Sequence, residues 1–180
     1  MMTVDTLMTE WLAGTGAQAA QWITPLGEPQ VALPLLVVGM ITLHGVPKSR
    51  LMARSIFVHG LLLLVLVQGT KRVIDRPRPG AVMRGLQSLP GGHLHQHAFP
   101  SGHSAFGAYI AGVMAFSGVG PMVATGAVIV GLAVGWSRVA IGAHWFGDVI
   151  VGLGLGFCLA FLALRRHREA WLRSPGDSVI

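Results

Sequence analysis

The sequence predicts an all-α fold, a polytopic membrane helical bundle that forms a single domain over residues 1–180. Hydrophobic residues make up 52% of the chain and charged residues only 11%, whereas about a quarter of a soluble domain is charged. The formal net charge is +6. In so apolar a chain the cations must gather in loops, which suits anionic lipid head groups or phosphate. The single cysteine, Cys158, lies in an apolar run and excludes an intrachain disulfide.

Residues 1–24 predict an interfacial helix. Val4, Leu7, Trp11 and Trp22 fall near one helical face, and tryptophan favours the level of the lipid head groups. A short sixth membrane span is the alternative interpretation of this segment.

Five clear transmembrane helices are predicted after it, at about residues 30–46, 55–70, 105–116, 121–136 and 145–164. His44 and His59 lie in or beside the first two spans and are interpreted as hydrogen-bonded packing residues. Glycine pairs at 131 and 135 and at 152 and 156 are spaced for close contact between helices.

Charged residues between the last two spans stand out, because their flanks carry no charge. Arg138, His144 and Asp148 interrupt an apolar half of the chain, and a charge in such a setting is costly without a partner or a function. His144 and Asp148 are four residues apart, so on a helix they would share one face. The carboxylate could then hold one imidazole nitrogen and leave the other free to attack or to take a proton.

A long polar connection, residues 71–100, is interpreted as an active-site loop. Lys71 opens it, and Pro77 and Pro79 flank Arg78. The two prolines limit the freedom of Arg78 and so lower the entropy lost when it grips an anion.

The same connection contains three alternating histidines, His93, His95 and His97. Such a cluster could bind a metal, but no nearby cysteine or acidic residue completes it. We therefore expect a solvated loop near the head groups and no metal site.

The connection ends at Ser101, Gly102 and His103, which open the third span. Ser101 is a natural N-cap, and Gly102 permits a close backbone approach. Free amides at a helix start bind phosphate, assisted by the helix dipole, and His103 lies in that first turn.

Alternation of the spans across the bilayer brings these segments together. The second span ends at Lys71 and the fourth at Arg138, while the third begins at Ser101 and the fifth at His144. All four points fall on one membrane face. Three cations, a helix N-terminus and two histidines make a phosphate site with a nucleophile and an acid.

The same residues carry a family resemblance. Lys71, six residues and Arg78-Pro79; Pro100-Ser101-Gly102-His103; and Ser137-Arg138, five residues, His144, three residues and Asp148 resemble the three signature motifs of the type 2 phosphatidic acid phosphatase superfamily. The resemblance covers roughly residues 55–165, and no catalytic position departs from the pattern. The N-terminus does depart, since membrane members often have six spans.

The resemblance implies a role for each residue. His144 would attack phosphorus and form a phosphohistidine, Asp148 would hold the His144 tautomer, and His103 would protonate the leaving oxygen and then activate water. The phosphoryl oxygens would be bound by Lys71, Arg78, Ser101, Gly102 and Arg138. Family members work without a metal, so we expect no cofactor.

The resemblance leaves several functions open. The predicted activity is hydrolysis of a lipid phosphate monoester or pyrophosphate, such as phosphatidylglycerol phosphate, phosphatidic acid or an isoprenyl pyrophosphate. A phosphotransferase using the same phosphohistidine and a non-catalytic lipid-binding protein are the alternatives. Vanadium haloperoxidases share this type of site but are soluble and larger.

The expected partners are a membrane lipid and the bilayer, with no nucleic acid, and the expected location is a bacterial inner membrane. The positive-inside rule places the active site on the extracytoplasmic face. Lys48, Arg50, Arg54 and the tail arginines lie on the opposite side, and phosphate accounts for Lys71, Arg78 and Arg138.

Overall fold

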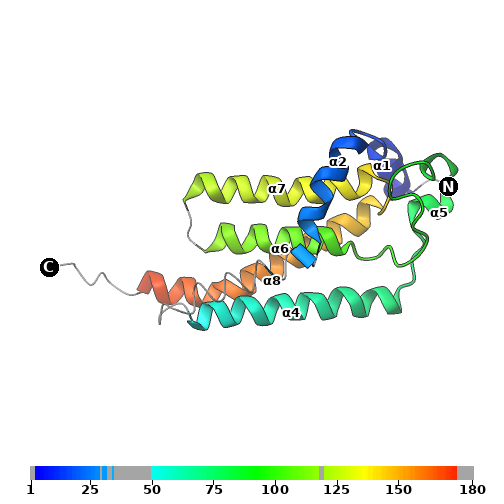
Figure 1. Ribbon diagram of the computed structural model, residues 1–180. Helices are drawn as coiled ribbons and strands as arrows, with labels where there is room; N and C mark the ends of the chain where they lie inside the picture. Colours follow the sequence, from blue (N-terminus) through cyan, green and yellow to red (C-terminus); the bar gives the residue numbers. More distant parts are fainter. Residues whose placement is uncertain (1–2, 29, 32–33, 35–49, 118–119, 174–180) are drawn as a thin grey trace.

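The computed structural model describes residues 3–28, 30, 31, 34, 50–117 and 120–173. Within these residues every regular element is helical, as predicted (Figure 1). The α-helices are α1 Val4–Leu12, α2 Ala17–Ile23, α4 Arg50–Val73, α5 Pro79–Val82, α6 Gly102–Phe116, α7 Pro121–Ala140 and α8 Phe146–Arg173. Two short 3₁₀ helices are added, η1 Thr24–Gly27 and η3 Arg84–Leu86.

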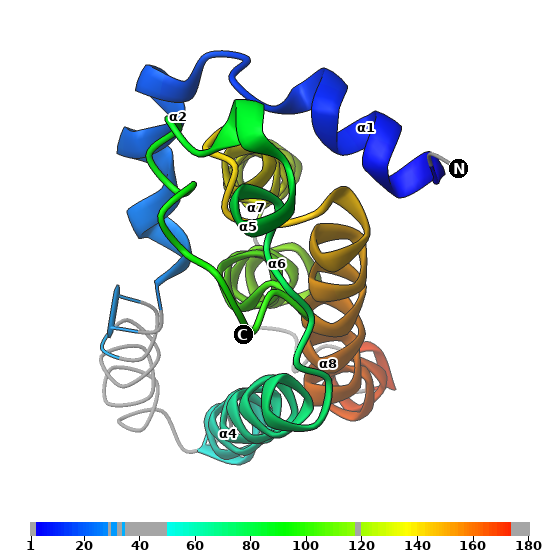
Figure 2. The ribbon, with the colours of Figure 1, turned by 90° about the vertical axis from the view of Figure 1, so that its right-hand side faces the viewer.

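Among the described residues, the body of the molecule is formed by α4, α6 and α7, which run along nearly one direction, and by α8, which slants across them (Figure 1). The view along the bundle shows α6 in the middle, with α7 and α8 beside it and α4 below (Figure 2). The helix α6 contacts all three of its neighbours, which makes it the central element of the core.

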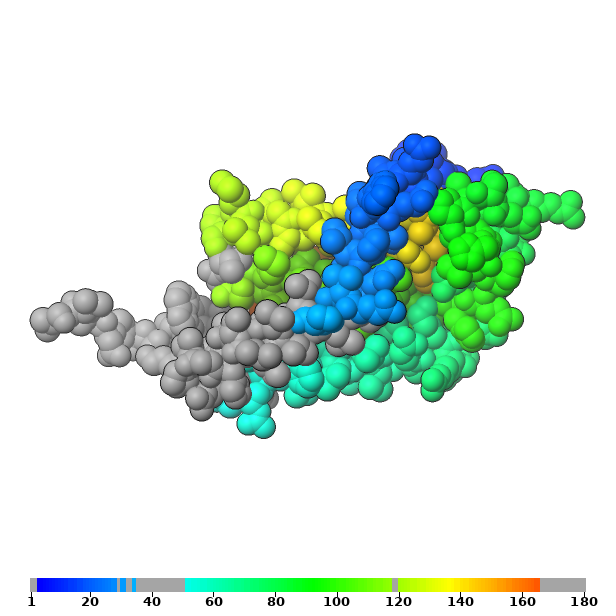
Figure 3. All heavy atoms as spheres, viewed as in Figure 1, coloured from blue at the N-terminus to red at the C-terminus, as the bar shows by residue number. Residues whose placement is uncertain are grey.

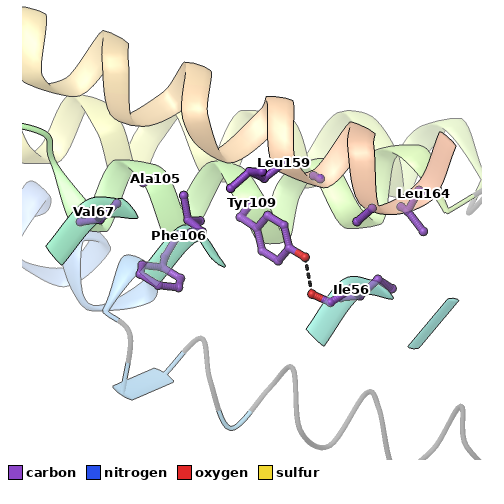
Figure 4. Packing of buried hydrophobic residues seen from close by; sticks show 10 residues of the cluster. Ile56, Val67, Ala105, Phe106, Tyr109, Leu159 and Leu164 are labelled. Atoms are coloured by element: carbon purple, nitrogen blue, oxygen red, sulfur yellow. Dashed lines mark hydrogen bonds between the residues drawn. The ribbon is translucent and has the colours of Figure 1, made fainter. Parts of the chain in front are cut away.

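The core between α4, α6 and α8 is apolar and tightly closed. Phe106 and Tyr109 of α6 are fully buried against Leu63 and Val67 of α4 (Figure 4). The Tyr109 hydroxyl donates a hydrogen bond to the Ile56 carbonyl, which satisfies the one polar atom of this aromatic side chain within the apolar core.

Glycines let α6 and α8 approach closely. A Cβ added at Gly156 would lie 2.2 Å from the Ala105 carbonyl oxygen, and one at Gly152 would lie 2.5 Å from that of Ser101. The predicted close contact at this glycine pair is therefore confirmed. Because Ser101 stands at the start of α6, the close contact at Gly152 also holds the N-terminal ends of α6 and α8 together.

Three described helices are long and apolar enough to cross a membrane: Leu51–Val73, Pro121–Ala140 and Phe146–Arg165. Exposed Leu51, Val58 and Val65 on α4 are the kind of surface that lipid covers. The helix α6 has only 15 residues, or about 22 Å at 1.5 Å per residue. The predicted span 30–46, with His44, falls almost entirely outside the described residues.

The N-terminal segment differs from its prediction. Residues 1–24 were expected to form one helix, but the chain turns between α1 and α2, where Gly14 and Gly16 have positive φ angles of 81° and 60°. Helices of nine and seven residues are too short to span a bilayer, which needs about 20 residues. The segment lies instead across the C-terminal end of α7 and the N-terminal end of α8 (Figure 3).

Candidate active site

Four helix ends gather at one end of the bundle (Figure 1). The helices α4 and α7 end there and carry Lys71 and Arg138 in their last turns. The helices α6 and α8 begin there and carry His103 and Asp148 in their first turns. The connection 74–101 closes over this end and contributes Arg78, so the structure brings together the segments that the sequence predicts to meet.

His144 is buried in the turn between α7 and α8, with 2% of its side chain exposed. We expected it on a helix face, but α8 begins two residues later, at Phe146. Its Nδ1 lies 2.7 Å from the carbonyl oxygen of Ala98. Because a carbonyl only accepts, Nδ1 carries the proton and Nε2 keeps its lone pair. That Nε2 lies 3.4 Å from Nη1 of Arg78.

The surroundings of His144 favour a neutral ring. Burial lowers its pKa well below the usual 6.5, and the positive charges of Arg78, Arg138 and Lys71 lower it further. The hydrogen bond to Ala98 acts in the opposite direction. His144 is therefore neutral near pH 7, which is the protonation state in which an imidazole is a nucleophile.

Asp148 does not hold His144 as we predicted. The two are within ion-pair range, with Oδ2 3.7 Å from Nδ1, but the hydrogen bond at Nδ1 goes to Ala98. The fully buried carboxylate accepts from Nη1 of Arg76 at 2.6 Å and from the Trp145 amide at 3.0 Å. Since Asp148 is the third residue of α8, the second bond resembles half of a capping box.

Backbone oxygens hold two of the three predicted phosphate-binding cations. Lys71 Nζ donates to the His97 carbonyl at 2.7 Å. Arg78 donates from Nε to Gln96 at 2.8 Å and from Nη1 to Ala143 at 3.0 Å. These hydrogen bonds fix the Lys71 ammonium and the Arg78 guanidinium but leave their positive charges uncompensated. Both groups therefore remain able to attract an anion.

Arg138 is held differently. Its Nη1 donates to the Thr24 hydroxyl, which comes from the N-terminal segment. Its Nε is buried and has no hydrogen-bond partner among the described residues. A buried unpaired donor is costly, and a phosphoryl oxygen would satisfy it.

The start of α6 contributes Ser101, Gly102 and His103 to the site. Ser101 caps the helix by accepting from the Ser104 amide at 3.4 Å, and its own amide donates to the Asp148 carbonyl at 3.0 Å. His103 is 23% exposed, with Nε2 3.8 Å from a carboxylate oxygen of Glu28. A Cβ added at Gly102 would make only an ordinary contact with Val67, at 3.5 Å, so packing alone does not require this glycine.

The three alternating histidines lie in the connection between α4 and α6. Within the described residues no group of three or more His, Cys, Asp or Glu side chains is arranged to hold a metal ion. His93 and His95 are exposed. His97 lies 3.1 Å from both the Lys71 carbonyl and Asp75, so it ties the end of α4 to the connection that covers it.

Several residues of this site were missed at the level of sequence. Arg76 lies inside the first motif and binds Asp148, so an unassigned charge between Lys71 and Arg78 was a usable signal. Asp5, Thr24 and Glu28 reach Arg76, Arg138 and His103 from the N-terminal segment. No spacing in the sequence links them to the motifs.

Comparison with known proteins gives consistent relatives. The chain is 33% identical over 150 residues to phosphatidylglycerophosphatase B of Bacillus subtilis, which covers 78% of this chain and 70% of that protein. It is 36% identical over 106 residues to a lipid A 1-phosphatase of Rhizobium etli, covering 57% of this chain. That match spans only 43% of the Rhizobium protein.

Two solved structures share the fold. LpxE of Aquifex aeolicus superposes with a TM-score of 0.75 at 24% identity, over 91% of this chain and 96% of that one. A transmembrane PAP2-type phosphatidylglycerolphosphate phosphatase from Bacillus subtilis superposes with a TM-score of 0.65 at 28% identity, over 95% and 87% of the two chains. Residues 51–172, which contain all three motifs, match the PAP2 superfamily, and the chain belongs to that superfamily of membrane lipid phosphatases.

Proposed function

We propose that this protein is an integral membrane lipid phosphatase that cleaves a phosphate monoester or pyrophosphate through a phosphohistidine at His144. The observation that carries the proposal is the fixed state of that ring. Its Nδ1 proton is bound to Ala98, and its Nε2 lies beside the Arg78 guanidinium. A buried, neutral imidazole whose unprotonated nitrogen adjoins a cation is suited to attack an anionic phosphoryl group.

In the first step Nε2 of His144 attacks phosphorus and the bond from phosphorus to the lipid oxygen breaks. The leaving oxygen takes a proton from His103, which begins a different helix and can act from the opposite side, as in-line displacement requires. Burial and the nearby cations lower the pKa of His103 to about 3, so the ring takes up this proton only when the negative charge of the bound phosphate offsets those cations. The developing charge on the imidazole is stabilised by the nearby Asp148 carboxylate.

In the second step water attacks the phosphohistidine. His103, now neutral, takes the proton of that water, the bond from phosphorus to Nε2 breaks, and inorganic phosphate leaves with His144 neutral again. The same group therefore acts as acid and then as base.

Three fixed cations stabilise the charge on the phosphoryl oxygens in both steps. Lys71, Arg78 and Arg138 already act electrostatically on His144, so an anion beside Nε2 would lie within their field. The first turn of α6, with Ser101 and Gly102, adds donors, as does the Nε of Arg138, which has no partner within the described part of the chain. No metal or cofactor is needed for the charge to be compensated.

The relatives suggest the substrate class. Their names specify phosphatidylglycerophosphate and the 1-phosphate of lipid A, and both are anionic phosphates on lipids. Phosphatidic acid and isoprenyl pyrophosphates present the same group, and the roles proposed for the site residues all concern the phosphate.

The test is phosphate release by purified protein in detergent from a panel of these lipids, with His144→Asn as the inactive control. Release from at least one lipid that is absent in the variant supports the proposal. Binding without release would favour a non-catalytic lipid-binding protein. Transfer of phosphate to an added acceptor lipid, in place of release to water, would favour a phosphotransferase.

We further propose that the site faces away from the cytoplasm in a bacterial inner membrane. The charge count that motivates this includes residues outside the described part of the chain. Labelling of a single cysteine placed at Gln96 in intact cells by an impermeant reagent tests it. Labelling at Gln96 with protection of a cysteine at Ser178 supports the orientation, and the reverse pattern overturns it.

A further inference from the structure

Arg76 is shared between two carboxylates. Its Nη1 donates to the buried Asp148 and its Nη2 to Asp5 of α1, and its guanidinium lies over the Trp145 ring with Cζ 5.1 Å from the centroid. Burial alone would lower the pKa of Arg76, but the hydrogen bond to Asp5 and the charges of Asp148 and Asp5 raise it above its usual range. Arg76 is therefore a permanent cation next to Asp148 and close to His144.

Because Arg76 binds both Asp5 and Asp148, only one of its two terminal nitrogens is available to Asp148. A guanidinium free of other partners binds a carboxylate through two parallel N–H groups. Here Asp5 takes Nη2, so Asp148 receives only Nη1, on Oδ1. Its Oδ2 is left for the Trp145 amide and for the His144 ring at 3.7 Å.

The helix α1 is well placed to hold Asp5 there. The other oxygen of Asp5 accepts from the Gly147 amide at 2.7 Å, and the Thr9 hydroxyl accepts from the Phe146 amide at 3.0 Å. These are the first two amides of α8, which the helix itself cannot satisfy. One face of α1 thus caps the helix that carries Asp148, while Val4, Leu7 and Trp11 on the other face are exposed.

We propose that Asp5 and Arg76 are a positioning pair that sets the orientation of the Asp148 carboxylate toward His144, so that one residue of the N-terminal helix acts on the catalytic centre from outside it. The inference rests on the proposed phosphohistidine reaction. Asp5 touches neither substrate nor His144, and it acts through Arg76 and Asp148. Without its charge, Arg76 binds Asp148 with both nitrogens and draws the carboxylate away from the ring.

Six variants test the pair: Asp5→Asn, Asp5→Glu, Thr9→Val, Glu10→Gln, Arg76→Lys, and Asp5→Asn combined with Arg76→Lys. Thr9→Val removes an α1–α8 hydrogen bond without touching Arg76. Glu10→Gln removes an exposed carboxylate from the same helix. The readouts are kcat, KM, the rate of phosphoenzyme formation in a single turnover and the thermal midpoint in detergent.

Asp5→Asn should slow phosphoenzyme formation roughly tenfold, a typical size for charged groups coupled in one network, with KM unchanged. Asp5→Glu should restore most of the rate. Thr9→Val and Glu10→Gln should keep the wild-type rate even where the thermal midpoint falls. Asp5→Asn combined with Arg76→Lys should be no slower than Arg76→Lys alone.

If Asp5→Asn and Thr9→Val both slow phosphoenzyme formation in proportion to their loss of thermal stability, the positioning role of Asp5 and Arg76 is overturned. The helix α1 would then contribute only to the stability of the fold. A wild-type rate in Asp5→Asn would overturn it as well, with the proposed function intact as long as wild-type protein forms the phosphoenzyme. Absence of a phosphoenzyme in wild type would overturn the function and the pair together.

Discussion

Nδ1 of His144 donates its hydrogen bond to the Ala98 carbonyl at 2.7 Å, although the Asp148 carboxylate is only 3.7 Å from the same atom. A backbone carbonyl therefore selects the tautomer. That choice is robust, because a main-chain acceptor cannot be removed by a side-chain substitution. The role left to Asp148 is electrostatic, which separates two functions that a single carboxylate is often assumed to combine.

The first prediction concerns Asp148→Asn. Because Ala98 still fixes Nδ1–H, kcat should fall by only about 10²-fold, the low end of the range for acid–base and tautomer assistance. The ¹⁵N chemical shifts of the His144 ring should still report a protonated Nδ1. A tautomer switched to Nε2–H, together with a loss near 10⁴-fold, would return tautomer control to Asp148.

The second prediction concerns the hydroxyl that holds Arg138. Thr24→Val removes the partner of Nη1, so the guanidinium is less well fixed for the phosphate. KM should rise about three- to tenfold, the effect of losing an ordinary hydrogen bond worth about 1 kcal/mol, with a smaller change in kcat. The measurement is steady-state kinetics on the best lipid substrate.

Thr15→Val is the matched control, since it is the same change in the same segment and Thr15 bonds only to the Leu12 carbonyl. It should leave KM unchanged. Equal changes in KM for the two variants would mean that the N-terminal segment acts through general stability rather than through Arg138.

The third prediction concerns the packing of α6 on α8. Gly156→Ala places a methyl group 2.2 Å from the Ala105 carbonyl oxygen, against backbone that cannot easily move. The free energy of unfolding of this variant should be about 1–3 kcal/mol lower than that of the wild type, the usual cost of overpacking. Gly154→Ala on the same helix meets nothing within 4 Å and should keep the wild-type midpoint. Thermal unfolding in detergent measures both, and equal midpoints would contradict the helix contact.

The sequence predicted that the site residues gather, because connections between consecutive membrane spans lie alternately on the two faces of the membrane. The second and fourth connections therefore share one face. That rule needs only the order of apolar and polar segments, so Lys71, His103, Arg138 and Asp148 were placed together correctly. Motif spacing added Arg78 and His144. Exact helix limits were less predictable, since His144 was expected within a helix and lies two residues before α8.

The contribution of the N-terminal segment could not be predicted in the same way. Asp5, Thr24 and Glu28 reach the site by long-range folding, since each lies more than 70 positions along the chain from its partner. Local pattern indicated only an amphipathic surface. The acceptor on Ala98 was equally hidden, because a carbonyl belongs to every residue and its direction depends on the folded backbone.

The fourth prediction concerns metals and inhibitors. Fixed cations compensate the phosphoryl charge, so activity should be unchanged after EDTA treatment, and vanadate should inhibit because it can adopt a trigonal-bipyramidal form in the phosphate pocket. Phosphate release with and without each reagent checks this. Activity that is lost in EDTA and restored by zinc would assign His93, His95 and His97 to a metal site.

His144 is the proposed covalent nucleophile, and rapid quench with a ³²P-labelled lipid substrate is the most direct test of that role. We expect an acid-labile, alkali-stable phosphoenzyme whose label maps by peptide analysis to His144, with no label and almost no turnover in His144→Ala. Label on His103, or near-normal turnover in His144→Ala, would contradict it.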